Sequence, residues 1–169
     1  MPVTPRKPVI FNAASKPWGS MLYSANNNQN QTIGKLGSAQ TIAADIVATL
    51  KDSTVNPGTL AQLSMKWGCR SVMNGTYWDF FRKVAKQYRF NKFIETSRWD
   101  SLVECLYAGG LAACCVRGGF WARANNYILV YAIDEDSVYG TTAWVKEAKQ
   151  PIYMLRRDNM RCFCLIADT

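Results

Sequence analysis

The hydrophobic pattern of this chain changes its period close to Gly110, and that change limits the folds open to it. Before this point apolar residues recur every three to four positions, as on one face of a helix. After it they form short runs that are typical of strands. Helices followed by strands predict an α+β fold with an antiparallel sheet. Because no internal repeat or linker is visible, residues 31–169 are expected to form a single domain, helical up to about residue 110.

The clearest helical segment follows Ser38, where the apolar positions match one buried helix face: Ala39, Ile42, Ala43, Ile46, Val47 and Leu50. Shorter helices are expected after a Thr59 cap, after Thr76 with Tyr77 facing inward, and after a Ser97 cap. Strands are expected at 111–117, 127–133, 138–141 and 161–166. Residues 1–30, which are rich in Pro, Ser and Asn, predict an extended arm that packs on the body through Trp18 and Tyr23.

The chain carries 20 Lys and Arg against 12 Asp and Glu, a formal net charge of +8. This balance favours acidic partners: an acidic protein, nucleic acid, nucleotides or anionic cell-wall polymers. A basic surface that serves only solubility is an equal alternative. No apolar run has the length of a signal peptide or a membrane span, so a cytoplasmic protein without membrane association is expected. The cysteines follow no metal-ligand spacing, which predicts free, mostly buried thiols and neither a metal nor a cofactor.

No histidine occurs among the 169 residues. Histidine is the usual general base for serine and cysteine nucleophiles, and it is the commonest metal ligand. Its absence therefore excludes Ser-His-Asp and Cys-His-Asn catalysis, and with them most catalytic zinc sites.

Several short motifs nevertheless follow the order and spacing of an enzyme family. They are Gln31-Thr32-Ile33-Gly34-Lys35-Leu36-Gly37-Ser38, Gly75-Thr76-Tyr77-Trp78, Leu106-Tyr107-Ala108-Gly109-Gly110, Asn126-Tyr127-Ile128-Leu129-Val130 and Val138-Tyr139-Gly140-Thr141-Thr142-Ala143. Over about residues 8–168 this set resembles the papain-like cysteine peptidases related to the bacteriocin-leader (double-glycine) peptidases, especially the stand-alone type of Firmicutes and their phages. The resemblance implies a papain-like fold, in which a central buried helix packs on an antiparallel sheet.

The same resemblance places the catalytic positions at residues that lack the family's chemistry. Ser38 stands at the cysteine position, Asn126 at the histidine position and Thr142 at the position of the orienting acid. Gln31 lies near the place of the oxyanion-hole glutamine and is interpreted as a relic. A serine hydroxyl needs a base, and asparagine cannot accept its proton at neutral pH. We therefore interpret Ser38 as a helix N-cap, Asn126 as a strand-end hydrogen-bonding residue, and the protein as a pseudoenzyme without peptidase activity.

Two basic and aromatic segments are candidate binding surfaces. The first carries the cations Arg82, Lys83, Lys86, Arg89 and Lys92 among aromatic residues, a combination that suits phosphate contact and base stacking. Its alternative interpretation is a solvated helix face. The second is a loop before Asn126 with Arg117, Phe120, Trp121 and Arg123, where an exposed ring would suit a protein interface or a nucleotide pocket. Its alternative is a hairpin whose rings turn inward.

Together these observations predict a catalytically inactive, peptidase-like binding protein, and the family resemblance implies that a phage or a mobile element encodes it. It would inhibit or dock on an acidic or nucleic-acid-associated target in the host cytoplasm, such as a defence system. Two alternatives stay open: a residual peptidase or cell-wall amidase (endolysin-like) that uses Ser38, and a structural phage component. The sequence predicts no particular oligomeric state.

Overall fold

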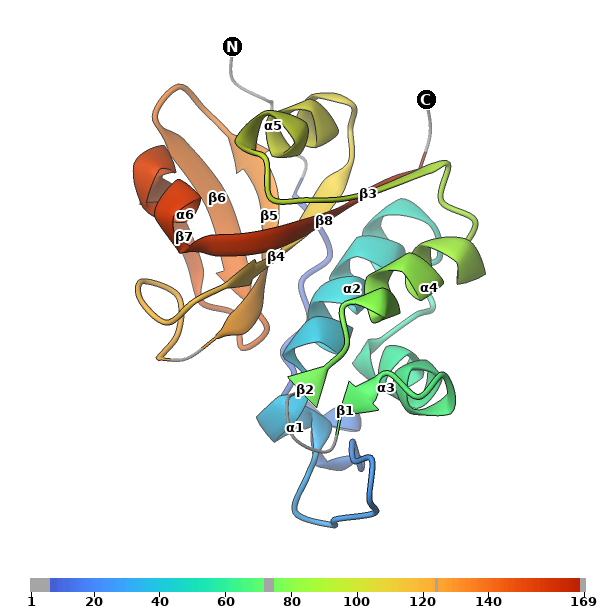
Figure 1. Cartoon of the computed structure of the whole chain (residues 1–169). Coiled ribbons are helices and arrows are strands. Elements are labelled where there is room, and N and C mark those ends of the chain that lie inside the picture. The colour runs from blue at the N-terminus through green and yellow to red at the C-terminus, as the bar shows by residue number, and fades with distance from the viewer. Residues whose placement is uncertain (1–6, 72–74, 124, 168–169) are drawn as a thin grey trace.

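The computed structural model describes residues 7–71, 75–123 and 125–167, which form a helical half and a sheet half (Figure 1). Up to Gly110 the elements are the 3-10 helix η1 (Trp18–Ser20), α1 (Ile33–Leu36), α2 (Ser38–Leu50), α3 (Pro57–Lys66), β1 (Arg70–Ser71), β2 (Gly75–Thr76), α4 (Asp79–Gln87), β3 (Lys92–Thr96) and α5 (Trp99–Tyr107). Beyond it come β4 (Leu111–Val116), β5 (Asn126–Ile133), β6 (Ser137–Thr142), β7 (Glu147–Pro151), α6 (Ile152–Asp158) and β8 (Asn159–Ile166). The change of period predicted near Gly110 is confirmed.

The main sheet has the strand order β3-β8-β4-β5-β6-β7, and all neighbouring strands run antiparallel. The four predicted strands correspond to β4, β5, β6 and β8, so the α+β class is confirmed. Sequence reasoning missed β3 and β7, which form the two edges of this sheet. Edge strands are half exposed and commonly carry charged residues. These two strands contain Lys92, Glu95, Glu147 and Lys149, so neither has the apolar run by which a buried strand is predicted.

The sheet is covered on both faces. In β4, Leu111, Ala113 and Cys115 belong to the same apolar core as helix α2. The alternate residues Ala112, Cys114 and Val116 belong to a second core with α5. Successive side chains of a strand point to opposite faces, so a strand buried on both sides reads as a continuous apolar run.

Helix α2 is buried from Ser38 to Ala48. It lies between one face of the sheet and the helices α3 and α4 (Figure 1), whereas α5 covers the opposite face of the sheet. The predicted apolar face is therefore confirmed, but the opposite face is buried as well. A helix enclosed in this way holds its first residue in a fixed position relative to the sheet.

The expected helix starts need correction. Asn56, and not Thr59, is the cap of α3, because the Asn56 side chain accepts a 3.2 Å hydrogen bond from the Thr59 amide. The residue before α5 is Arg98, whose side chain makes no capping bond, so Ser97 is not its cap. Helix α4 begins only at Asp79, after a short strand. Tyr77 consequently precedes the helix and is 54% exposed, where the sequence predicted an inward position.

The described part of the N-terminal arm lies against helix α2. The Phe11 amide donates a 2.8 Å hydrogen bond to Oδ1 of Asp45, a buried residue of that helix. The Trp18 ring is half-buried and packs edge-to-face on Phe11, with ring centroids 5.5 Å apart. Tyr23 is completely buried. These contacts attach the arm to the body.

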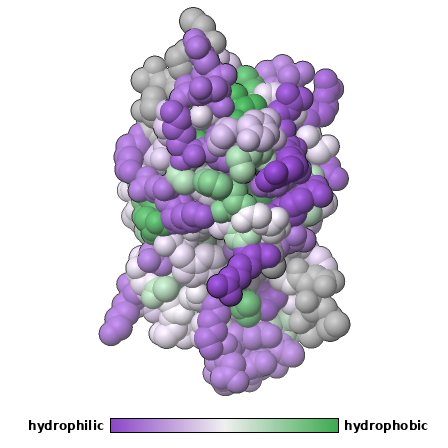
Figure 2. Space-filling view, turned by 90° about the vertical axis from the view of Figure 1, so that its left-hand side faces the viewer, coloured by the Kyte–Doolittle hydropathy of each residue, from purple (hydrophilic) through white to green (hydrophobic). Residues whose placement is uncertain are grey.

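All six cysteines are free and buried, as predicted. Among the described residues no helix is long and apolar enough to cross a membrane. Figure 2 shows that the face bearing α6 and β7 is largely hydrophilic, with hydrophobic residues only in small separate patches. Most apolar residues of the strands lie in the two cores, so few of them are exposed on this face.

Candidate functional site

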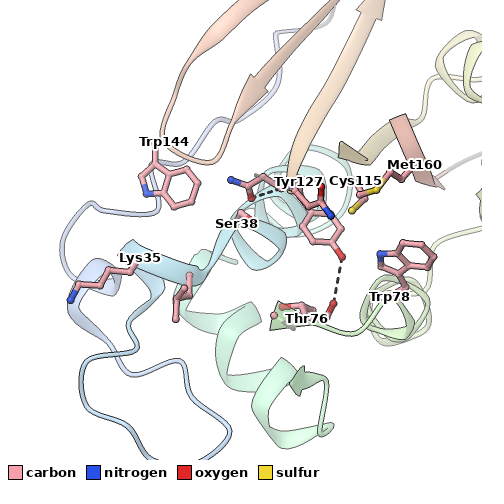
Figure 3. Close-up of a pocket in the computed structure, with 12 residues that line it drawn as sticks. Lys35, Ser38, Thr76, Trp78, Cys115, Tyr127, Trp144 and Met160 are labelled. Carbon is pink, nitrogen blue, oxygen red and sulfur yellow. Dashed lines mark hydrogen bonds between the residues drawn. The ribbon is translucent and has the colours of Figure 1, made fainter. Parts of the chain in front are cut away.

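A cleft of about 420 Å³ lies at the start of α2, between the helical half and the sheet half. The walls come from segments that are far apart in the sequence: Lys35, Leu36 and Ser38; Thr76 and Trp78; and Cys115, Asn126, Tyr127, Trp144 and Met160. Figure 3 shows Trp144 on one side and Trp78 on the other, with Ser38 and Tyr127 between them. The cleft thus has aromatic walls around a polar centre.

Ser38 is the first residue of α2, and Gly37 occupies the N-cap position. The interpretation of Ser38 as the cap is therefore wrong. A Cβ at Gly37 would lie 2.8 Å from the Ile33 carbonyl oxygen, so the tight turn between α1 and α2 requires glycine. This turn places Ser38 in the cleft, where the residue is 8% exposed and its hydroxyl has no hydrogen-bond partner among the described residues.

Asn126 opens strand β5 and lies in the same cleft. Its Oδ1 accepts a 2.9 Å hydrogen bond from the Tyr127 amide, which fixes the orientation of the side chain. The Nδ2 group has no acceptor among the described residues and can donate a hydrogen bond to a ligand in the cleft. The side chain at the histidine position is thus a donor, and it offers no site for a proton from Ser38.

Thr142 closes strand β6 and does not line the cleft. Its Oγ1 accepts hydrogen bonds from the amides of Trp144 (3.3 Å) and Lys146 (3.1 Å). The residue at the acid position therefore organises the turn that carries Trp144.

Gln31 also lies outside the cleft walls. Its backbone oxygen accepts a 2.8 Å hydrogen bond from the Tyr23 amide, in the connection that leads to α1. The sequence instead missed Gln40, whose Nε2 lies 2.6 Å from the Tyr23 hydroxyl and 2.9 Å from Oγ1 of Thr76, a cleft residue. A polar residue inside an apolar helix was the signal, because a buried amide needs hydrogen-bond partners.

The cleft walls carry no Asp, Glu or His in the described part of the chain. Burial raises the pKa of the Cys115 thiol and of the Tyr127 phenol, so both are protonated at neutral pH. Lys35 is the cation among the wall residues, and its side chain points away from Ser38 (Figure 3). Within the described ranges, no group of three or more His, Cys, Asp or Glu side chains is arranged to hold a metal ion.

The overall fold is similar to that of a solved structure, the peptidase domain of Streptococcus ComA, which is described as a bifunctional ABC transporter involved in a quorum-sensing pathway. The match has a TM-score of 0.58 at 14% sequence identity, and it covers 79% of this chain and 93% of that domain. This chain has a papain-like peptidase fold. The fold expected from the motifs is therefore confirmed. No protein-family model matches the sequence, and a search of curated proteins finds no match.

A second feature of the structure is a shallow hollow of about 630 Å³ beside α4. We call it the α4 basic hollow, and it is lined by Trp67, Arg82, Lys83, Lys86, Gln87 and Arg89. Asp79 pairs with Arg82 at 2.7 Å and with Lys83 at 3.9 Å. Lys86 and Arg89 form no ion pair with any described residue. Lys92 lies on β3 and does not line the hollow, so the predicted basic stretch is divided between two elements.

The loop before β5 differs from the predicted binding surface. Trp121 is only 4% exposed, and its Nε1 donates a 2.7 Å hydrogen bond to Oε1 of Gln150. It is therefore part of the core, and its assignment as an exposed anchor is wrong. Phe120 is half-buried, with Nζ of Lys146 4.8 Å from its ring centroid. The cations Arg117 and Arg123 are exposed on this loop.

Proposed function

We propose that this protein is a catalytically inactive papain-like domain that acts by binding a partner. The proposal rests on the side chains around Ser38, where no general base lies among the described residues. The Asn126 amide cannot accept a proton, and the Cys115 and Tyr127 side chains are themselves protonated. A serine hydroxyl without a base is a weak nucleophile, and losing one member of a catalytic unit costs several orders of magnitude in rate.

The partner is an acidic protein or a nucleoprotein. The net charge of +8 and the α4 basic hollow support this proposal, because clustered cations raise the association rate with acidic surfaces. Lys86 and Arg89 contribute most, since Asp79 partly neutralises Arg82 and Lys83. From the sequence resemblance, we further propose a phage or mobile-element product that inhibits or docks on a host target, such as a defence system, in the cytoplasm.

The absence of catalysis is tested with activity-based probes. A fluorophosphonate and a thiol-reactive peptide probe should leave residue 38 unlabelled at pH 7, and intact-mass measurement reads this directly. Ser38→Ala is the matched control. If the wild type is labelled and Ser38→Ala is not, the result would favour the second candidate, a hydrolase using Ser38. The observation behind that candidate is that the hydroxyl lies in the cleft and has no hydrogen-bond partner among the described residues.

The binding surface is tested by charge reversal. Affinity purification from the native host identifies the partner, whose affinity is then measured between 50 and 200 mM salt. Lys86→Glu combined with Arg89→Glu should weaken binding strongly at low salt and reduce its salt dependence. Lys16→Glu combined with Arg98→Glu changes the net charge equally at exposed positions outside the hollow, and binding should be much less affected. If the two double variants weaken binding equally, the α4 basic hollow is not the binding surface.

A further inference from the structure

We infer that the cleft binds a carboxylate at the start of α2, namely the C-terminal carboxylate of a polypeptide. The inference rests on the proposed function, because it takes the cleft to hold a chain without cleaving it. Three features support it: a helix terminus without a side-chain cap, two side chains with unused hydrogen-bonding groups, and described walls that carry aromatic rings and no acidic residue.

The positive end of α2 faces no acidic residue on the described walls of the cleft. The helix has 13 residues, no acidic residue in its first turn and no side-chain cap. The Thr41 amide, which donates to the Gly37 oxygen at 3.0 Å, makes the first hydrogen bond along the helix, so the amides before it have no intrahelical partner. The aligned peptide dipoles concentrate partial positive charge at such an end. At the floor of the cleft, this charge favours an anion.

Ser38 provides the independent sign of a ligand. Its side chain is 8% exposed and lines the cleft, yet its hydroxyl bonds to none of the described residues. Because this hydroxyl opens onto the cleft, it is available to a ligand that enters there. Asn126 adds the Nδ2 donor, because its oxygen is already engaged by the Tyr127 amide. The hydroxyl, the amide and the helix end belong to one cleft, and each can donate a hydrogen bond to the same anion.

The charge and size of the cleft select the kind of anion. Lys35 points away from Ser38 and the described walls carry no acidic residue, so the helix end supplies the positive charge at the proposed position. A partial charge of this kind matches a singly charged carboxylate better than a doubly charged phosphate. The rings of Trp78, Tyr127 and Trp144 offer apolar contact to the rest of the ligand. A volume of about 420 Å³ admits a few residues of an extended chain and excludes a folded domain. Capture of a C-terminal carboxylate by backbone amides is an established mode of peptide recognition.

The first test places the anion on the protein itself. Ser38→Asp should melt about 1–4 °C higher than the nearly isosteric, uncharged Ser38→Asn at pH 7 and low salt, because the carboxylate compensates the helix end. The difference should shrink at high salt. The pKa of the introduced carboxyl should be lowered in the folded state, so the gain is present above its unfolded pKa of about 4 and is lost as the pH falls through the folded value. A lower melting temperature for Ser38→Asp would overturn the inference, since burial would then dominate.

The second test measures the ligand. Immobilised full-length protein is incubated with randomised N-acetylated tetrapeptides, prepared once as free acids and once as C-terminal amides, and retained peptides are counted by mass spectrometry. The wild type should retain the acids at least about tenfold better than the amides, the effect of one lost charge-assisted hydrogen bond. Ser38→Asp should abolish this preference, whereas Ser38→Asn should bind acids more tightly than Ser38→Asp does.

The remaining outcomes discriminate among ligands and functions. Equal retention of acids and amides by the wild type would refute the carboxylate site. Sodium acetate or inorganic phosphate that competes as well as the peptide acids would identify a small anion and refute the chain terminus. Cleavage of the peptides, which the same spectra would show, would refute the proposed absence of catalysis. The acid-to-amide ratio of the uncleaved peptides would still test the carboxylate site separately.

Discussion

The indole Nε1 of Trp144 donates a 2.8 Å hydrogen bond to the backbone oxygen of Gly34. This bond joins the turn between β6 and β7 to helix α1, and so ties the sheet half to the helical half beside Ser38 (Figure 3). Thr142 supports the same turn through the amides of Trp144 and Lys146. The position assigned to the orienting acid of a peptidase therefore shapes the cleft wall.

Trp144→Phe should loosen this wall. The Gly34 oxygen loses its partner, so the free energy of unfolding should fall by about 1 kcal/mol. Hydrogen exchange at residues 34–37 and 143–146 should accelerate. Trp18→Phe is the matched control, because its Nε1 donates an equally short 2.8 Å bond to the Asn12 oxygen within the arm. If both variants change exchange at the cleft alike, the Trp144 bond has no special role there.

Trp121 should behave as a core residue. Trp121→Ala should lower the free energy of unfolding by about 3–5 kcal/mol, because it empties a buried site. Trp121→Phe should cost about 1–3 kcal/mol, since the Oε1 of Gln150 then lacks the donor that now lies at 2.7 Å. Urea unfolding measures both. Phe120→Ala, on the half-buried neighbour, is the comparison and should cost less. A loss below about 1 kcal/mol for Trp121→Ala would contradict its burial.

The hydroxyl network behind the cleft should contribute to stability. The Tyr23 hydroxyl lies 2.6 Å from Nε2 of Gln40, 2.9 Å from Oγ of Ser64 and 2.7 Å from Oγ1 of Thr76. Tyr23→Phe leaves buried polar groups short of partners and should cost about 1–3 kcal/mol in chemical unfolding. Tyr107→Phe removes a hydroxyl from a ring that is 50% exposed, and it should be nearly neutral. Similar losses in both variants would mean that the buried network adds nothing.

Asp45 should make stability depend on pH. Burial raises the pKa of this carboxyl well above its usual value, although the Phe11 amide bonds its Oδ1 at 2.8 Å. Because the folded pKa exceeds the unfolded one, the contribution of the protonated form is complete below about pH 4 and is lost as the pH rises through the folded pKa. Asp45→Asn should therefore gain stability relative to the wild type as the pH rises. Urea unfolding between pH 4 and 9 measures the difference, and parallel curves would refute the assignment.

Particular elements show how far the sequence could be interpreted. Helix α2 was predictable because six apolar positions repeat with the helical period, and the central strands because they are buried on both faces. The edge strand β3 was not, since Lys92 and Glu95 lie at a half-exposed edge that only pairing with β8 defines. The cap of α3 was misplaced by three residues, because Asn56 and Thr59 both carry capping side chains and their roles depend on the backbone path.

The sequence by itself determined the α+β order, the central helix, the free thiols and the absence of histidine, because periodicity and composition are properties of the chain alone. Only the tertiary structure decided which polar groups meet. It buried Trp121 against Gln150, bound Gln40 to Tyr23, and placed the Ser38 hydroxyl in the cleft with no partner in the described part of the chain. These outcomes depend on how segments distant in the sequence pack together, and hydrogen bonding and burial are settled only by that packing.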